Sequence, residues 1–548
     1  MNIAAFTSKL RDQVRSIDWR LLFFLLLFVN VKLAVKLVAI LLIFILRPQF
    51  KFGFRLIVSR IPLFYPLVIL IALLNLLFSG LIMNINYDLA FITGIFFWIM
   101  CILAFHQVRL AVEKNEPAVV HRTLLVFFAI NAIVSLCIYA GIVWETGAIN
   151  PYRYQGNFQK YFINTGDYIK GISFDTSTTN AVLNAFAVIY FLVRNEFWKV
   201  ICFMAILLLC GSNMINILLS AVFLFLFLFR SSKVQKSMMV ICWMMMAVFL
   251  VKISPQNNQY ILETWQRITG NTRISKPVIT HVIPITEKPD SILNASERKQ
   301  KIAQLYIDSI TKAEFNSVVV PTALVKLPDT VLTNTGKPEI PHASIHTAPF
   351  QHKWDTTQLQ KKLLRFADSE RNSMTALPVM PKQKNLPGKL IAMEQTILYL
   401  RSHPSHLLTG TGMGNFSSKL AFRTTGLMLS GGYPVNHSYI SDLFRDNHLD
   451  LYLSYFVRSD KLHSLTNSPN SVYDQLLAEY GLLGLLSFLL FYLGFFLRRY
   501  RSLTYGIPVL LLMGGVFFTD YWFEQLSVLV IFELIVLLNL KETESIKG

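Results

Sequence analysis

The sequence predicts an all-α polytopic integral membrane protein, and three observations lead to this fold class. Of its 548 residues, 53% are hydrophobic and only 15% are charged. The apolar residues gather in runs of about 16 to 26, the length that a helix needs to cross a hydrocarbon layer about 30 Å thick. Short connections rich in Lys and Arg separate these runs, as in helical hairpins whose loops stay in the cytoplasm.

The candidate spans follow the apolar runs in order. The first is a double-length block, residues 19–46, and Lys32 and Lys36 lie where a turn would divide it. The other spans are 62–82, 88–106, 120–145, 179–193, 197–212, 213–229, 237–252, 477–497, 503–519 and 523–540. If the block enters and leaves the membrane, the chain has about twelve transmembrane helices and both termini are cytoplasmic.

Two polar segments then face the outside, residues 146–178 and the much longer 253–476. The domain organisation that follows is transmembrane helices 1 to 9 over 1–252, a large extracytoplasmic domain over 253–476, and transmembrane helices 10 to 12 over 477–548.

The large extracytoplasmic domain has its own internal pattern. Apolar residues at helical spacing predict amphipathic helices over 290–315 and 355–371. Between them, from about 316 to 354, Pro, Thr and Lys dominate and no period is visible, so we interpret this stretch as a loop or insert.

The net charge of +19 does not indicate a nucleic-acid partner. The basic residues are spread over the connections between spans rather than concentrated on one soluble face. All five cysteines (Cys101, Cys137, Cys202, Cys210 and Cys242) lie in apolar runs, without a Cys-x-x-Cys pair. The sequence therefore predicts neither a disulfide framework nor a metal site.

Three polar motifs stand out. The first is an amphipathic helix that ends in His-Pro and is followed by a glycine-rich turn; its residues are Lys389, Met393, His403, Pro404, Gly410, Gly412, Gly414 and Phe416. The second leads into the tenth span, with Pro469, Asn470, Ser471, Tyr473, Gln475, Glu479, Gly481 and Gly484. The third lies in the first polar segment and consists of Arg153, Gly156 and Phe158.

Together these motifs resemble the O-antigen ligase and O-antigen polymerase superfamily. In that family an external helix begins with Arg, where this chain has Lys389, and ends in His-Pro before a Gly-x-Gly-x-Gly-x-Phe-like turn. A Pro-His-Asn sequence then precedes Tyr, Gln, Glu and Gly-Leu-x-Gly. Here Asn470 and Ser471 replace the His-Asn pair, so the imidazole that ligases are thought to use at this point is absent. Residues 276–385 have no counterpart in the family pattern, so the resemblance implies that they are a variable insert.

The resemblance implies a GT-C-like enzyme of the bacterial inner membrane, with its large loop in the periplasm. Such an enzyme transfers a glycan from a polyprenyl-diphosphate-linked donor, with inversion and without a metal or cofactor. Loss of the His-Asn pair favours a polymerase of O-antigen or exopolysaccharide repeat units; an O-antigen ligase or a protein O-oligosaccharyltransferase is the alternative. The partners would be the lipid-linked glycan, a glycan, lipid or protein acceptor, membrane lipids and other polysaccharide-assembly proteins.

Fixed cations are the first requirement of such a site, because the diphosphate gathers negative charge as it leaves. The external candidates are Arg153, Lys170, Lys389, Arg423 and Arg445, of which Arg153 and Lys389 carry the motif match. A solvated surface charge is the competing interpretation of each one.

The acceptor hydroxyl also needs a group that receives its proton. His437 and His448 could replace the missing imidazole, and Glu479 could accept the proton or stabilise the start of its span. His403 fits a helix-end residue better than a base. The glycine-rich turn follows a helix rather than a strand, which disfavours a dinucleotide-binding loop.

Two other classes of function compete with a transferase. A transporter or flippase would need ionisable residues inside several spans, whereas the main ones here are few and lie mostly near span ends: Lys32, Lys36, Asp520, Glu524 and Glu533. A membrane-anchored binding or sensor protein would use the extracytoplasmic domain, but would not need so many spans.

Overall fold

The computed structural model describes most of the helical part of the chain. The described residues are 16–54, 59–79, 84–146, 149–153, 168–254, 387–425, 432–453 and 468–545. Within these ranges every regular element is a helix, and four helical stretches are long and apolar enough to cross a membrane. The all-α class is therefore confirmed for the described residues, and the four long apolar stretches agree with a membrane protein. The insert 276–385, with the amphipathic helices predicted over 290–315 and 355–371, lies outside the described residues.

The four long stretches are α5 (Ile85–Lys114), α6 (Pro117–Thr146), α10 with its π-helical end (Lys233–Ile253), and α18 with α19 (Val472–Leu497). Seven shorter apolar helices are also described: α2 (Trp19–Phe28), α3 (Leu33–Leu46), α4 (Phe64–Ser79), α7 (Ser177–Val193), α8 (Phe197–Leu209), α9 (Asn213–Phe229) and α20 (Gly506–Val516). The last helix is α22 (Ser527–Ser545).

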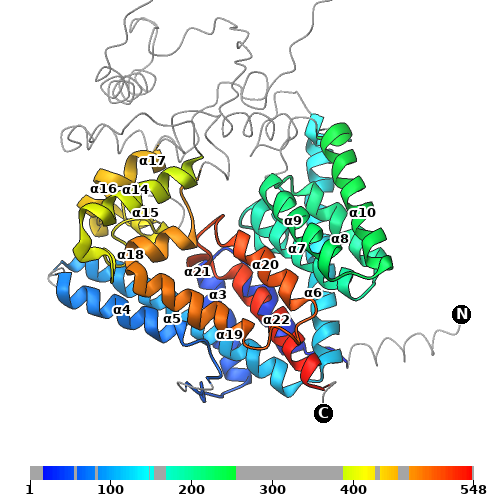
Figure 1. Cartoon of the computed structure of the whole chain (residues 1–548), viewed down its shortest axis with the longest axis horizontal. Coiled ribbons are helices and arrows are strands. Elements are labelled where there is room, and N and C mark those ends of the chain that lie inside the picture. Colours follow the sequence, from blue (N-terminus) through cyan, green and yellow to red (C-terminus); the bar gives the residue numbers. More distant parts are fainter. Residues whose placement is uncertain are drawn as a thin grey trace, which may run out of the picture.

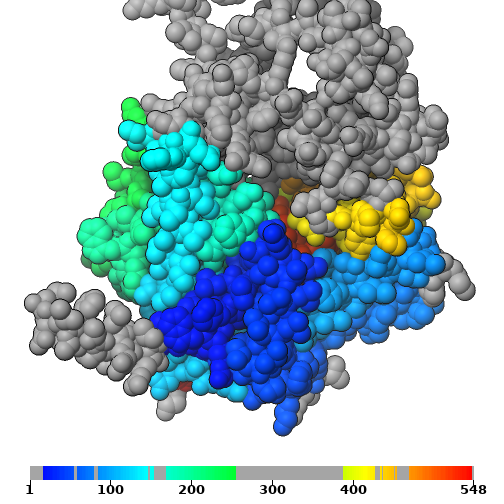
Figure 2. Space-filling model, turned by 180° about the vertical axis from the view of Figure 1, so that it is seen from behind, coloured from blue at the N-terminus to red at the C-terminus, as the bar shows by residue number. Residues whose placement is uncertain are grey.

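The double-length block 19–46 forms two helices, as predicted, with the turn at residues 29–32. Lys36 lies in the first turn of α3, where its Nζ donates to the carbonyl of Phe28 and to Oγ of Ser527, each at 2.7 Å. One lysine thus ties α2 and α3 to the start of α22. Figure 2 shows α2 and α3 (dark blue) covering the middle of one face, beside α6 (cyan).

Several helix boundaries differ from the predicted spans, and α5 and α18 are two of them. α5 extends from residue 85 to 114 instead of 88 to 106, and α18 begins at Val472 rather than at 477. The side chain of Asn84 caps α5 by accepting from the backbone N–H groups of Asn86 and Tyr87. Apolar runs define the lipid-facing length of a helix, whereas caps and tertiary contacts extend it through polar residues.

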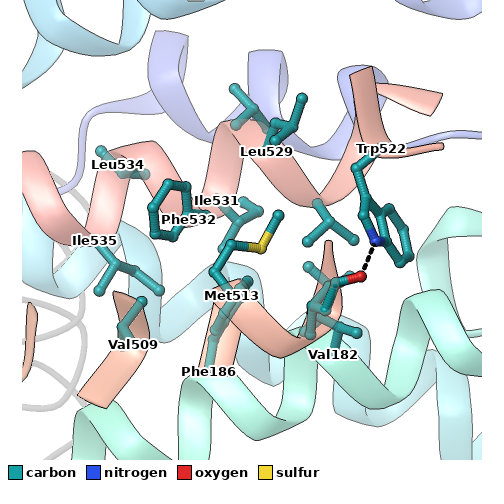
Figure 3. Close-up of a cluster of buried hydrophobic side chains, with 14 of the residues drawn as sticks. Val182, Phe186, Val509, Met513, Trp522, Leu529, Ile531, Phe532, Leu534 and Ile535 are labelled. Carbon is teal, nitrogen blue, oxygen red and sulfur yellow. Dashed lines mark hydrogen bonds between the residues drawn. The ribbon is translucent and has the colours of Figure 1, made fainter. Parts of the chain in front are cut away.

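α22 lies at the centre of the molecule, between the α7–α10 group and the α4–α5–α18 group (Figure 1). All residues from Ser527 to Asn539 are buried, since α22 contacts α5, α6, α7 and α20. Figure 3 shows part of this core, in which Phe532 and Met513 pack with Phe186 from α7. The indole N–H of Trp522 donates to the carbonyl of Val516 at 2.6 Å, so the polar group of this buried ring is satisfied.

Basic residues and both described chain ends gather at one end of the bundle. Arg47 pairs with Asp18, Arg194 with Glu542, and Arg499 with Glu544. Nζ of Lys541 donates to carbonyls at the end of α5. The short basic connections, far apart in sequence, therefore share one side of the molecule.

The opposite end carries a group of small helices. They are α14 (Gly388–Ser402), α15 (Lys419–Arg423), α16 (Asp442–Asn447), α17 (Leu449–Leu453) and α21 (Trp522–Gln525). In Figure 1, α14 to α17 lie together over one end of α18 and α4. The first two motifs of the sequence, from Lys389 to Phe416 and from Asn470 to Gly484, fall at this end.

Candidate functional site

The glycine-rich turn and the start of α18 form one backbone-bonded unit. α18 is broken at Gly481, where φ is 65° and ψ is −164°. The N–H groups of Leu482 and Leu483 donate to the carbonyls of Leu407 and Leu408 at 2.9 and 3.0 Å. On the other side of the break, Thr411 and Gly412 donate to the carbonyls of Ala478 and Glu479 at 2.9 and 3.1 Å. The turn thus satisfies the groups that the break in the apolar helix leaves free.

Two motif glycines permit this close approach. A Cβ on Gly481 would lie 2.4 Å from the carbonyl oxygen of Leu408, and a Cβ on Gly410 would lie 2.4 Å from the carbonyl carbon of Glu479. Both glycines also have positive φ values. The two motifs therefore need glycine at these positions because their backbones touch.

The carboxylate of Glu479 is held inside the glycine-rich turn. Oε2 accepts the N–H of Gly414 at 2.8 Å. Oε1 accepts the N–H groups of Phe416, Ser417 and Ser418 at 3.1, 3.1 and 3.0 Å. This turn is an anion-binding nest, but the protein's own carboxylate fills it. The structure gives Glu479 a binding role inside the protein and leaves the turn no N–H groups at these positions for a phosphate.

Lys389 is also bonded within the protein. It is 2% exposed, and its Nζ donates to Oγ of Ser468 at 3.0 Å and to the carbonyls of Asn470 and Thr519 at 2.6 and 2.7 Å. An ammonium group has three N–H donors, so these bonds use all of them. Burial lowers the pKa of Lys389 to about 7, against the attraction of Asp520 and Asp474. Lys389, one of the two cations that carry the motif match, therefore joins α14 to the segments before α18 and α21, and its ammonium group has no N–H left for a ligand.

The other predicted cations have different surroundings. Arg445 forms ion pairs with Asp442 at 2.8 Å and Asp446 at 3.1 Å. Lys170 precedes the 3₁₀ helix η4 (Gly171–Ser173), next to the turn between α2 and α3. Arg153 ends the 3₁₀ helix η2 (Pro151–Arg153), and its side chain lies outside the described part of the structure, as do Gly156 and Phe158.

Arg423 has a neighbour that the sequence analysis did not select. Lys419 lies one helical turn before it on α15, and both side chains are half-buried. In the part of the chain that the structure describes, neither forms an ion pair, although both act electrostatically on the carboxyl of Glu524. Like charges at this spacing repel each other, so an anion would stabilise the pair.

The three candidate histidines differ in exposure. His437 is exposed. His403 caps the end of α14, where its ring stacks on Tyr399 and its Nδ1 lies 3.2 Å from the carbonyl of Tyr399, as for a helix-end residue. His448 is fully buried against the edge of Phe416. Burial lowers the pKa of His448 to about 3, so its ring is neutral.

The remaining motif residues have packing and capping positions. Pro404 starts a 3₁₀ helix, Phe416 packs with Tyr399 and Ala478, and Gly484 lies under the side chain of Tyr480. Gly412 and Gly414 have positive φ values within the turn. Asn470 supplies the carbonyl that binds Lys389, and Ser471 is the buried N-cap residue of α18.

A buried polar cluster adjoins these motifs, and sequence reasoning missed most of it. Asp474 is 1% exposed and lies 3.7 Å from His448. Gln475 follows Asp474 in α18, and its Nε2 donates a hydrogen bond to Oε1 of Glu524 at 2.5 Å. The sequence does contain a signal for this cluster, because Asp474 and Gln475 lie in the first turn of an otherwise apolar helix. Polar groups at such positions cost free energy to bury and are therefore kept only where they have a role.

Comparisons with protein families, curated proteins and solved structures identify no relative of this chain. Among the described residues, no group of three or more His, Cys, Asp or Glu side chains is arranged to hold a metal ion.

Proposed function

We propose that this protein is a membrane glycosyltransferase that uses a polyprenyl-diphosphate-linked oligosaccharide as donor. The observation that carries the proposal is the backbone-bonded unit of the two motifs, with Gly410 against Gly481 and Glu479 inside the glycine-rich turn. Motifs about seventy residues apart in sequence thus build one structure beside a buried polar cluster. The geometry agrees with the resemblance to the O-antigen ligase and polymerase superfamily and supports a catalytic use of this end.

The donor's diphosphate would bind at Lys419 and Arg423. Their side chains are half-buried and have no ion-pair partner among the described residues. A fixed lysine and arginine would stabilise the charge that develops on the leaving diphosphate. Lys419 and Arg423 thus take the role that the sequence suggested for Lys389, because the three N–H donors of Lys389 already bind protein oxygens.

The finer features of the proposal follow from the resemblance and the charge distribution. We assign the basic end of the bundle to the cytoplasm and the end with α14 to α17 to the periplasm of a bacterial inner membrane. About twelve membrane segments in a GT-C-like arrangement are part of this proposal. We favour a repeat-unit polymerase, with ligation to a lipid or protein acceptor as the alternative, because Asn470 and Ser471 replace the His-Asn pair.

The test is glycan transfer by the purified protein in liposomes that contain a polyprenyl-diphosphate-linked oligosaccharide. We expect longer lipid-linked glycans and release of polyprenyl diphosphate. The double variant Lys419→Ala/Arg423→Ala should lower kcat/KM for the donor by about 10²-fold, since each charge-assisted contact contributes about 1.5 to 3 kcal/mol. Lys233→Ala, an exposed lysine at the first turn of α10, is the control and should keep wild-type transfer.

One result would contradict the proposed reaction, and another would contradict only the proposed donor site. One is a wild-type protein that moves the lipid-linked glycan across the liposome membrane without joining sugars, which would indicate a flippase. The other is a double variant with unchanged donor kinetics, which would remove Lys419 and Arg423 from the donor site while leaving the reaction itself standing.

A further inference from the structure

The residues that follow α3 form a fixed segment at the basic end of the bundle. The ring of Phe50 stacks on that of Phe44, with centroids 5.4 Å apart, and Phe52 packs on His106 at 4.6 Å. Nε2 of His106 donates to the carbonyl of Gln49 at 2.8 Å, since a carbonyl can only accept. Ring contacts and a hydrogen bond thus hold this non-helical segment against the ends of α3 and α5.

The same segment directs other side chains outward. Phe50 is 65% exposed and Phe54 is 41% exposed, and Lys51 between them is exposed as well. Single exposed apolar residues are common on proteins, but two exposed rings beside a cation on a fixed segment form a surface that needs a partner.

The first turns of α2 extend this surface. Trp19, Arg20 and Phe23 are exposed there, and a guanidinium N–H of Arg20 donates to the carbonyl of Leu46 at 3.4 Å. The start of α2 and the end of α3 are therefore neighbours, and Figure 2 shows the residues after α3 in a lighter blue below these two dark blue helices. The six outward residues, which we call the interfacial patch, are Trp19, Arg20, Phe23, Phe50, Lys51 and Phe54.

The two cations of the interfacial patch have no counter-charge in the part of the chain that the structure describes. Neither Arg20 nor Lys51 forms an ion pair there, and the nearby carboxyl groups of Asp18 and Glu113 already pair with other arginines. Arg20 also lies in the first turn of α2, where the helix dipole disfavours a cation. An external anion would therefore stabilise this surface.

The mixture of rings and cations defines the chemistry of that anion. Aromatic side chains at the end of a membrane helix lie at the level of the lipid headgroups, and guanidinium and ammonium groups bind phosphate. A soluble anion would neutralise the cations but leave the rings in water. A zwitterionic phospholipid would cover the rings but has no net charge. An anionic phospholipid satisfies both.

We propose that the interfacial patch binds the headgroup of an anionic phospholipid. In the proposed topology this lipid lies in the cytoplasmic leaflet, where anionic lipids attract basic segments next to membrane helices. Because α2 begins and α3 ends at the patch, the bound lipid fixes the depth of this helical hairpin in the bilayer. The binding itself does not depend on the proposed glycan transfer.

The test measures lipid binding to the full-length protein in neutral detergent. The protein is titrated separately with phosphatidylglycerol and phosphatidylcholine, and native mass spectrometry gives the affinity for each. The wild type should prefer phosphatidylglycerol. Arg20→Gln/Lys51→Gln should bind phosphatidylglycerol about 30-fold more weakly, at about five-fold per cation, with little change for phosphatidylcholine. Lys233→Gln, an exposed lysine at the same end but outside the patch, is the matched control and should bind like the wild type.

Two further variants separate charge from shape. Arg20→Lys/Lys51→Arg keeps both charges and should bind phosphatidylglycerol nearly as well as the wild type, which excludes a local folding defect as the cause of weaker binding. Phe50→Ser/Phe54→Ser should weaken the binding of both lipids alike, because the rings contact the apolar part that the two lipids share.

Either of two results overturns the lipid site. One is a wild type that binds phosphatidylglycerol no more tightly than phosphatidylcholine, which would leave the patch to a partner protein. The other is unchanged phosphatidylglycerol affinity in Arg20→Gln/Lys51→Gln. Because the assay follows binding alone, its outcome is independent of whether the protein transfers glycans.

Discussion

At the residue scale, burial gives two motif residues a structural role in place of the chemical role that the sequence suggested. Lys389 and Glu479 stand where the resemblance expects chemistry, yet both are bonded to the protein itself. Each is a charged group removed from water, and such a group is tolerated only when its hydrogen bonds are complete. Their role is to fix α14, the glycine-rich turn and the first half of α18 to one another.

The lowered pKa of Lys389 makes its contribution to stability depend on pH. Burial lowers that pKa from 10.5 to about 7 in the folded chain. Between these values the unfolded chain binds more protons, so the free energy of unfolding should rise with pH, by at most about 1.4 kcal/mol per unit from this group. Thermal unfolding of the wild type against Lys389→Met, from pH 7 to 9, measures it. We expect the unfolding free energy of the wild type, minus that of Lys389→Met, to increase as pH rises. A value that stays constant or decreases with rising pH would contradict the assignment.

At the element scale, the broken helix α18 joins the apolar bundle to the motif region. A membrane helix is tolerated with a break only where other groups satisfy the freed backbone. Here residues 407–412 do so, and Gly481 is the residue on which the arrangement depends.

Gly481→Ala should therefore destabilise the protein. The added Cβ would meet the carbonyl of Leu408 at 2.4 Å, and alanine is strained at a φ of 65°. We expect a loss of about 2 to 4 kcal/mol, from strain and overpacking together, seen as a lower unfolding temperature in detergent. The control is Gly494→Ala in α19, where the Cβ meets only the carbonyl of Leu489 at 3.6 Å. Equal stability of the two variants would show that the break is not required.

At the scale of the whole molecule, charge and aromatic residues mark two opposite ends. Trp198, 80% exposed, starts α8 near the basic end, and Trp144, 91% exposed, lies near the end of α6 at the other side. Tryptophans at both ends and basic residues at one end are the pattern of a helical bundle oriented in a bilayer.

This orientation predicts which residues a membrane-impermeant thiol reagent reaches. In a variant without the five native cysteines, Lys233→Cys should be labelled only from the cytoplasmic side. Ile149→Cys, at a site that is 86% exposed near the end of α6, should be labelled in intact cells with a permeable outer membrane. Labelling of both residues from the same side would refute the proposed topology.

The sequence by itself determined the helical class, the order of the apolar helices and the division of residues 19–46, because lipid contact would impose length and apolarity locally. It also located the glycine-rich turn and the helix that ends at His403. It did not reveal that Lys389 and Glu479 are internally bonded, or that Asp474 faces His448. Those facts depend on contacts between segments 61 to 130 residues apart for Lys389 and Glu479. The sequence shows where a charged residue is, but only the tertiary structure shows whether that residue already has hydrogen-bond partners within the protein.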